Sequence, residues 1–134
     1  MLRILIVEDD ALLAADLRDV VAGVGYTVLG PVDSVSHARE AVTGCDAALL
    51  DANVTDGTTF ELALSLQQAG RPFVFVTALT PSDLPPALAS AYLLRKPYRI
   101  ADIRHWLARL VEAPGIAAMN FAAADLVPAL STSE

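Results

Sequence analysis

The chain has 134 residues, the size of one domain, and 54% of them are hydrophobic while only 6% are aromatic. Nine basic and 16 acidic residues give a formal charge of −7, so the field of the molecule repels phosphate backbones and argues against direct nucleic-acid binding. The single cysteine, Cys45, excludes an internal disulfide and a zinc site built from cysteines.

Neither a secretion signal nor a membrane span is predicted. The apolar run at the N-terminus is too short for a signal peptide and lacks a small-residue cleavage site. No stretch reaches the roughly 18 uninterrupted apolar residues of a membrane helix. The sequence therefore predicts a cytoplasmic protein that does not enter a membrane.

The N-terminal part predicts a strand, a helix and a second strand. Residues 2–7 form an apolar run, and residues 11–24 carry apolar side chains at helical spacing, with Asp10 placed to cap the helix. The apolar positions of that helix are Leu12, Leu13, Leu17, Val20, Val21 and Val24. Residues 26–29 predict the second strand, which Gly30-Pro31 is expected to close.

A short helix and a buried strand come next. Ser34 or Ser36 can cap a helix that Gly44 ends, and residues 47–50 form an apolar run of the length of one buried strand. Asp51 follows directly, so it lies where this strand gives way to a loop. An aspartate in such a place is also a common turn former, and alone it does not establish any chemistry.

The rest of the chain predicts two more strands and two more helices. A helix is expected over residues 58–69, strands over 73–76 and 92–94, and a last helix after Lys96. Prolines in the segment 80–90 limit it to loop, so the fourth helix is expected to be irregular or shortened. The inward side chains are expected to be Phe60, Ala63, Leu64 and Leu66 in the third helix, and Ile100, Ile103, Trp106, Leu107, Leu110 and Val111 in the last.

Strand and helix patterns alternate five times, which favours an α/β fold. We expect a doubly wound, five-stranded parallel sheet in an order such as 2-1-3-4-5, with helices on both faces. Right-handed crossovers bring the carboxyl ends of such strands to one edge of the sheet. The residues at those ends are Glu8, Asp9, Asp10, Asp51, Thr77 and Lys96.

Carboxylates gathered at one edge need a cation. At an effective dielectric constant near 20, two charges about 4 Å apart interact by roughly 4 kcal/mol, so Glu8, Asp9 and Asp51 favour a divalent ion with oxygen ligands, such as Mg²⁺. Lys96, the only lysine among nine basic residues, adds a compact ammonium group. A carboxylate nucleophile, a metal, the Thr77 hydroxyl and an ammonium group are the parts that move a phosphoryl group onto an aspartate.

Four motifs, in this order at strand ends, are typical of one family. They are Glu8-Asp9 after Leu-Ile-Val, Asp51 after Ala-Leu-Leu, Thr77 after Phe-Val-Phe-Val, and Lys96-Pro97 before an aromatic residue. Together they resemble the receiver domain of response regulators in bacterial two-component signalling. The resemblance implies a flavodoxin-like receiver domain over residues 1–113 and a C-terminal tail over 114–134.

The resemblance also implies a role for each residue of the edge. Asp51 would accept a phosphoryl group from a sensor histidine kinase or a histidine phosphotransfer protein, and Thr77 and Lys96 would contact the phosphoryl oxygens. The implied Mg²⁺ ligands are Asp9, Asp51, the backbone carbonyl of Asn53 and, through water, Glu8. Such a protein is not an enzyme beyond self-catalysed phosphoryl transfer and slow autodephosphorylation.

A narrower resemblance points to a proteobacterial group of single-domain receivers. It rests on Gly30-Pro31-Val32, Thr58-Thr59-Phe60, residues 71–77 and residues 94–98. The fourth strand of that group typically reads Phe-Ala-Thr-Gly-Tyr, whereas this chain has Ala78 and Leu79 in place of Gly and Tyr. Leu93 stands where receivers usually carry a switch aromatic, with Tyr92 and Tyr98 nearby, so the usual output switch is not predicted.

Several other polar or reactive side chains have plain structural explanations. Asp10 is expected to be a helix cap, Asp56 and Gly57 turn residues, His37 and His105 surface or packing residues, Cys45 a buried packing residue, and Trp106 a core or interface residue.

Two other functions remain as alternatives. Asp51-Ala-Asn-Val-Thr55 is similar to the Asp-x-Asp-x-Thr loop of haloacid-dehalogenase-type phosphatases, but Asn53 lacks the general acid that hydrolysis needs, and the order of the acidic motifs is reversed. The second alternative is a receiver-like binding module that never takes phosphate.

The roughly 20 residues after Pro114 are too few for a DNA-binding or catalytic output domain. Their apolar residues, Met119, Phe121, Leu126, Val127 and Leu130, predict a tail helix, with a disordered tail as the alternative. Output is therefore expected through contact with a downstream protein, on the face of the fourth and fifth strands and the last helix. A homodimer is also left open.

Overall fold

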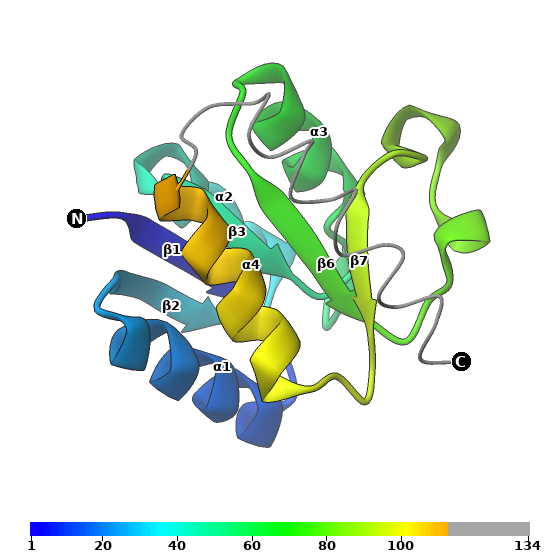
Figure 1. Ribbon diagram of the computed structural model, residues 1–134. Coiled ribbons are helices and arrows are strands. Elements are labelled where there is room, and N and C mark those ends of the chain that lie inside the picture. The colour runs from blue at the N-terminus through cyan, green and yellow to red at the C-terminus, as the bar shows by residue number, and fades with distance from the viewer. Residues whose placement is uncertain (113–134) are drawn as a thin grey trace.

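The computed structural model describes residues 1–112, without the side chains of the last two, and centres on one parallel sheet. Its five strands lie in the order β2 (Thr27–Val32), β1 (Arg3–Val7), β3 (Ala47–Leu50), β6 (Phe73–Thr77) and β7 (Tyr92–Arg95) (Figure 1). All four pairings between neighbours are parallel. The predicted fold class and strand order are confirmed.

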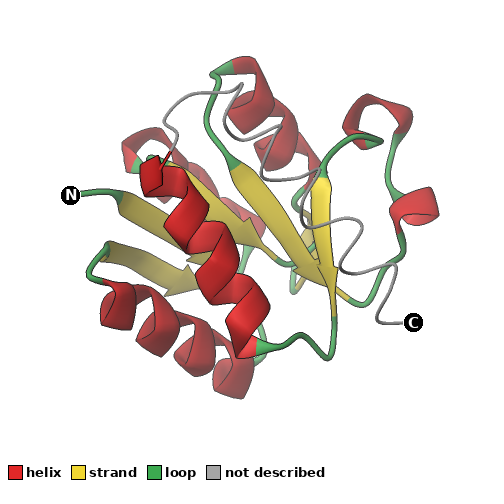
Figure 2. Cartoon of the chain, viewed as in Figure 1, coloured by secondary structure: helices red, strands yellow, loops and turns green. Residues whose placement is uncertain are grey.

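Helices cover both faces of this sheet (Figures 1 and 2). Helices α1 (Ala11–Val24) and α4 (Ile100–Glu112) pack on one face, and α2 (Val35–Ala41) and α3 (Phe60–Gln68) on the other. The two layers follow from the period of a strand, since successive side chains point to opposite faces. Ile4 and Ile6 belong to the core under α1 and α4, whereas Leu5 belongs to the core under α2 and α3.

The segment between β6 and β7 contains only two 3₁₀ turns, η2 (Pro81–Asp83) and η3 (Pro86–Leu88), where a crossover helix is usual. The predicted shortening of the fourth helix is confirmed, and its cause is that proline lacks the amide hydrogen that a continuing helix requires. Leu84 and Leu88 are buried and cover the sheet in place of a helix.

Strand β2 differs from the prediction, because it continues through Gly30-Pro31 to Val32 instead of ending at Leu29. Its register with β1 shifts at this point, so that Leu5 pairs with Leu29 but Val7 with Val32. Gly30 has a φ of +90°, which suits a bulge. Proline is tolerated there because β2 is an edge strand of the sheet.

The region after β3 was also predicted incorrectly in part. Residues 53–58 form a hairpin of β4 (Asn53–Val54) and β5 (Gly57–Thr58), and α3 begins only at Phe60. Leu62, Ala63 and Leu66 are the buried positions of α3, while Phe60 and Leu64 are half-buried. Leucines stand at positions 62, 64 and 66, and residues two apart lie on nearly opposite sides of a helix. The sequence therefore did not show which side of this helix faces the core.

The predicted caps of α1 and α2 are present, but two of the side chains predicted to face the core in α1 are exposed. Asp10 accepts hydrogen bonds from two amides of α1, and Ser34 caps α2, which passes into the 3₁₀ turn η1 (Val42–Gly44). In α1, however, Leu12 and Val24 are 80% and 38% exposed, because both lie in the terminal turns of the helix.

The predictions for residues 114–134, and for the Val111 side chain, fall outside the described part of the structure. Within that part, none of the helices combines the length and the apolar character needed to cross a membrane.

Candidate functional site

The sheet itself brings the predicted residues to one edge. Asp51 directly follows β3, and its amide donates to the Val7 carbonyl of β1 at 2.8 Å. Lys96 directly follows β7, and its amide donates to the Thr77 carbonyl of β6, also at 2.8 Å. Hydrogen bonding between neighbouring strands thus extends one residue past the strand ends. It fixes the backbone positions of Asp51 and Lys96, from which their side chains enter the site.

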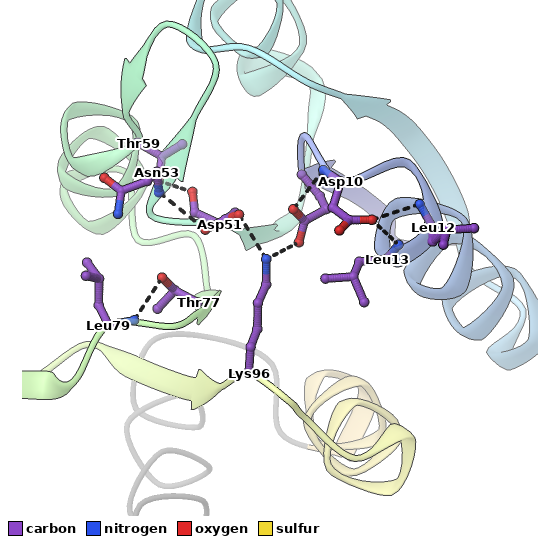
Figure 3. A network of polar contacts seen from close by, with 10 residues as sticks. Asp10, Leu12, Leu13, Asp51, Asn53, Thr59, Thr77, Leu79 and Lys96 are labelled. Atoms are coloured by element: carbon purple, nitrogen blue, oxygen red, sulfur yellow. Dashed lines mark hydrogen bonds and ion pairs between the residues drawn. The ribbon is translucent and has the colours of Figure 1, made fainter.

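Lys96 joins two acidic side chains at the centre of the site. Figure 3 shows its side chain reaching from the end of β7 toward Asp51. The Nζ atom lies 2.8 Å from Glu8 Oε1 and 3.0 Å from Asp51 Oδ2. The side chains of Glu8 and Asp51 are only 1% and 9% exposed, and that of Lys96 is 20% exposed. One ammonium group is therefore shared by two largely buried carboxylates.

Sharing one cation leaves the acidic pair only partly neutralised. Burial, together with the neighbouring Asp51, raises the pKa of Glu8 to about 7, although Lys96 and the Asp10 amide favour its charged form. Burial by itself would lower the pKa of Lys96, but its contacts with Glu8 and Asp51 outweigh this and raise that pKa. Lys96 is thus a stable cation near neutral pH, while Glu8 exchanges its proton in that range.

The acidic cluster fits a hard divalent cation. One carboxylate oxygen from each of Glu8, Asp9 and Asp51 can be chosen so that all three lie within 4.8 Å of one another. These are the oxygen donors that Mg²⁺ prefers, and Asp9 is exposed, which leaves the cluster open to solvent. A bound cation would also favour the charged form of Glu8, whose pKa is raised chiefly by burial.

Asn53 and Thr59 hold the backbone around Asp51 (Figure 3). The Asn53 amide donates to Asp51 Oδ1 at 3.3 Å, and the Thr59 hydroxyl donates to the Asp51 carbonyl at 2.8 Å. Thr59 is fully buried and was not predicted as part of the site. Thr59 immediately precedes α3, and its helical spacing from Leu62, Ala63 and Leu66 was the available signal for its burial.

Thr77 lies at the same edge, at the end of β6, and is 1% exposed. Its hydroxyl accepts a hydrogen bond from the Leu79 amide at 3.3 Å, in the segment that leads to the 3₁₀ turns. Leu93, at the usual place of the switch aromatic, is buried under this segment together with Leu84 and Leu88. Tyr92 is buried on the opposite face of the sheet.

The residues with plain structural explanations lie as expected. His37 and His105 are exposed, and Asp10 is a helix cap. Cys45 is buried and donates to the Val42 carbonyl at 3.2 Å, and burial raises the pKa of its thiol, so it is a packing residue. Trp106 is fully buried, which makes it a core residue.

No protein-family model matches the sequence, and no curated protein matches it. Solved structures do. The chain is 33% identical to SdrG from Sphingomonas melonis Fr1, over 83% of this chain and 97% of that one, with a TM-score of 0.69. It is 27% identical to a CheY-like response regulator receiver domain from Methylobacillus flagellatus, over 75% of this chain and 91% of that one, with a TM-score of 0.63. The chain belongs to the response-regulator receiver family.

A more distant receiver-like structure shares the fold. TrrA, a response regulator from Thermotoga maritima solved in complex with Mg²⁺-BeF, is 17% identical to this receiver domain, over 82% of this chain and 99% of that one, with a TM-score of 0.70. These likenesses do not favour the phosphatase alternative.

Proposed function

We propose that this receiver domain accepts a phosphoryl group on Asp51 in a reaction that depends on Mg²⁺. The observation that carries the proposal is the position of Lys96, whose ammonium group contacts both Asp51 and Glu8 beside the exposed Asp9. The site thus combines a carboxylate nucleophile, a cation and a cluster of oxygen ligands at the solvent edge of the sheet.

In the proposed reaction, an Asp51 carboxylate oxygen attacks the phosphorus atom of a phosphohistidine on a sensor kinase or a histidine phosphotransfer protein. The bond from phosphorus to the histidine nitrogen breaks, and that nitrogen keeps the electron pair. Lys96 and the Thr77 hydroxyl then contact the phosphoryl oxygens and offset their negative charge. When bound by Glu8, Asp9, Asp51 and the Asn53 carbonyl, Mg²⁺ supplies further charge stabilisation.

The proposal also covers the signalling context. The Gly30-Pro31-Val32 segment and residues 94–98 support membership of the proteobacterial single-domain group. Phosphorylation would then alter contact with a downstream protein in the cytoplasm, where a kinase has access to ATP. Because Leu93 replaces the switch aromatic, we expect the change at Thr77 to reach the face of β6, β7 and α4 without the usual aromatic switch. Output without an attached effector domain stays a prediction.

The test is to incubate the protein with acetyl phosphate and Mg²⁺ and to measure its intact mass. We expect a gain of about 80 Da in the native protein and none in Asp51→Asn. The matched control is Asp46→Asn, because Asp46 is a hydrogen-bonded carboxylate at the opposite edge of the sheet, beside the start of β1.

Each outcome of this test discriminates between the candidate functions. A gain that persists in Asp51→Asn would reject Asp51 as the acceptor. No gain and no Mg²⁺ binding would favour a binding module, while sustained hydrolysis of unrelated phosphate esters would favour a phosphatase.

A further inference from the structure

Asp56 ties the hairpin after Asp51 to helix α2. Its Oδ1 accepts a hydrogen bond from the Val35 amide at 2.6 Å, and its Oδ2 accepts one from the Ser36 amide at 3.2 Å. Both amides belong to the first turn of α2, about 20 positions earlier in the chain. Bonds from amides to a carboxylate are stronger than those between neutral groups. The two amides also hold the pKa of Asp56 below its ordinary value, the Val35 contact being the larger cause.

The hairpin held by Asp56 carries the backbone next to the proposed phosphoacceptor. Asn53 pairs with Thr58 and Val54 pairs with Gly57, so Asp56 lies in the turn between β4 and β5. At the base of the hairpin, the Asn53 amide donates to Asp51 Oδ1. Asn53 thus contacts Asp51 in the site and pairs with Thr58 in the hairpin. Movement of the hairpin would therefore move the Asn53 carbonyl relative to Asp51.

Helix α2 already has a cap of its own. Ser34 Oγ accepts from the His37 amide at 3.2 Å, within the same segment of chain. The Ser34 contact concerns only the helix, whereas the Asp56 contact joins the helix to the hairpin. This difference allows the effect of Asp56 on the hairpin to be separated from its effect on the helix.

We propose that Asp56 is a positioning residue for the Asp51 site. By holding the β4–β5 hairpin against α2, it keeps the Asn53 carbonyl and the Asp51 carboxylate at the spacing that binding of Mg²⁺ requires. Asp56 itself contacts neither the metal nor the phosphoryl group in this account. The inference rests on the proposed function, because the metal site is part of that function.

The test compares Asp56→Ala and Asp56→Asn with two control variants, all in the full chain. Ser34→Ala removes the cap of α2 but leaves the hairpin contact, and Asp46→Ala removes a carboxylate that accepts from the Arg3 amide at the opposite edge of the sheet. For each variant we would measure the Mg²⁺ dissociation constant by calorimetry, the unfolding temperature, and hydrogen exchange of the Asn53 amide without metal.

We expect Asp56→Ala to weaken Mg²⁺ binding about tenfold, the size typical of residues that support metal ligands from outside, and to speed exchange of the Asn53 amide. Asp56→Asn should show a smaller effect of the same sign, because its one carbonyl oxygen can still accept from Val35. Ser34→Ala and Asp46→Ala should lower the unfolding temperature while keeping the Mg²⁺ affinity within about twofold of the native value.

The inference is overturned if both Asp56 variants bind Mg²⁺ as the native protein does, or if Ser34→Ala weakens binding as much as Asp56→Ala. If Asp56→Ala does not fold, Asp56→Asn decides the question by the same comparison. A native protein that neither binds Mg²⁺ nor gains a phosphoryl group would instead reject the proposed function, and the inference with it.

Discussion

The Lys96 ammonium group lies 3.0 Å from the Asp51 carboxylate, and the same nitrogen lies 2.8 Å from Glu8. Two strands of the sheet separate the points from which Lys96 and Glu8 begin, since β3 and β6 lie between β1 and β7. The long side chain of Lys96, the one lysine of the sequence, spans this distance and neutralises part of the acidic cluster. The stability of the metal-free protein should therefore depend on Lys96.

Replacing Lys96 with methionine keeps an unbranched side chain but removes the charge. We expect Lys96→Met to lower the free energy of unfolding by about 2 kcal/mol without metal, less than the cost of breaking a fully buried ion pair because Glu8 can take up a proton. Urea denaturation with a chelator present measures this. Arg99→Met is the control, since Arg99 is 72% exposed and lies 3.8 Å from Asp102, so its loss should have no measurable effect. Equal stability of Lys96→Met and the native protein would contradict the prediction.

The affinity for Mg²⁺ should depend on pH through Glu8. Because burial raises the pKa of Glu8 to about 7, a proton competes with the cation below that pH, and the affinity should fall as the pH falls. Titration calorimetry at about pH 6 and about pH 8 would show weaker binding and more proton release at the lower pH. In Glu8→Gln this dependence should be reduced, because the titrating group is gone. A native dissociation constant that is the same at both values would show that Glu8 is already charged without metal.

Thr59 should stabilise the loop after Asp51 through its hydroxyl group. Thr59→Val keeps the shape of the side chain but leaves the Asp51 carbonyl without the 2.8 Å hydrogen bond. We expect a loss of about 1–2 kcal/mol in the free energy of unfolding, and slower phosphorylation by acetyl phosphate. Thr59→Ser retains the hydroxyl and should keep the native phosphorylation rate. Should both variants phosphorylate at the native rate, the hydrogen bond would have no role in placing Asp51.

Gly30 should not tolerate a side chain, in contrast to Gly23. A Cβ atom at Gly30 would lie 2.7 Å from the Val32 nitrogen and 3.0 Å from the Ile6 oxygen, at a φ of +90°. Gly30→Ala should therefore cost about 1–3 kcal/mol. Gly23 lies in α1 with no atom within 4 Å of such a Cβ, so Gly23→Ala should be neutral or stabilise by about 0.5–1 kcal/mol. Thermal unfolding of the two variants compares them directly, and similar melting temperatures would argue against the bulge at β2.

The strand order and the residues at the carboxyl ends of the strands could be predicted from the amino-acid sequence. Apolar runs of strand length alternated with helical patterns, and the handedness of parallel crossovers allowed few arrangements of such units. The sequence pattern therefore predicts that Asp51, Glu8 and Lys96 meet at one edge of the sheet. Asp10 and Ser34 were also predictable as caps, because a cap acts within a few residues of its own position.

The way in which the Asp51 loop is held depends on tertiary contacts that no sequence pattern indicates. The contact of Asp56 with α2 and the contact of Thr59 with the Asp51 carbonyl join segments that the β4–β5 hairpin brings together. Neither contact has a periodic signal, because the partners are joined through the fold and not through one helix or strand. Apolar periodicity reports which face of an element is buried, whereas a polar contact between distant segments depends on the final packing of both.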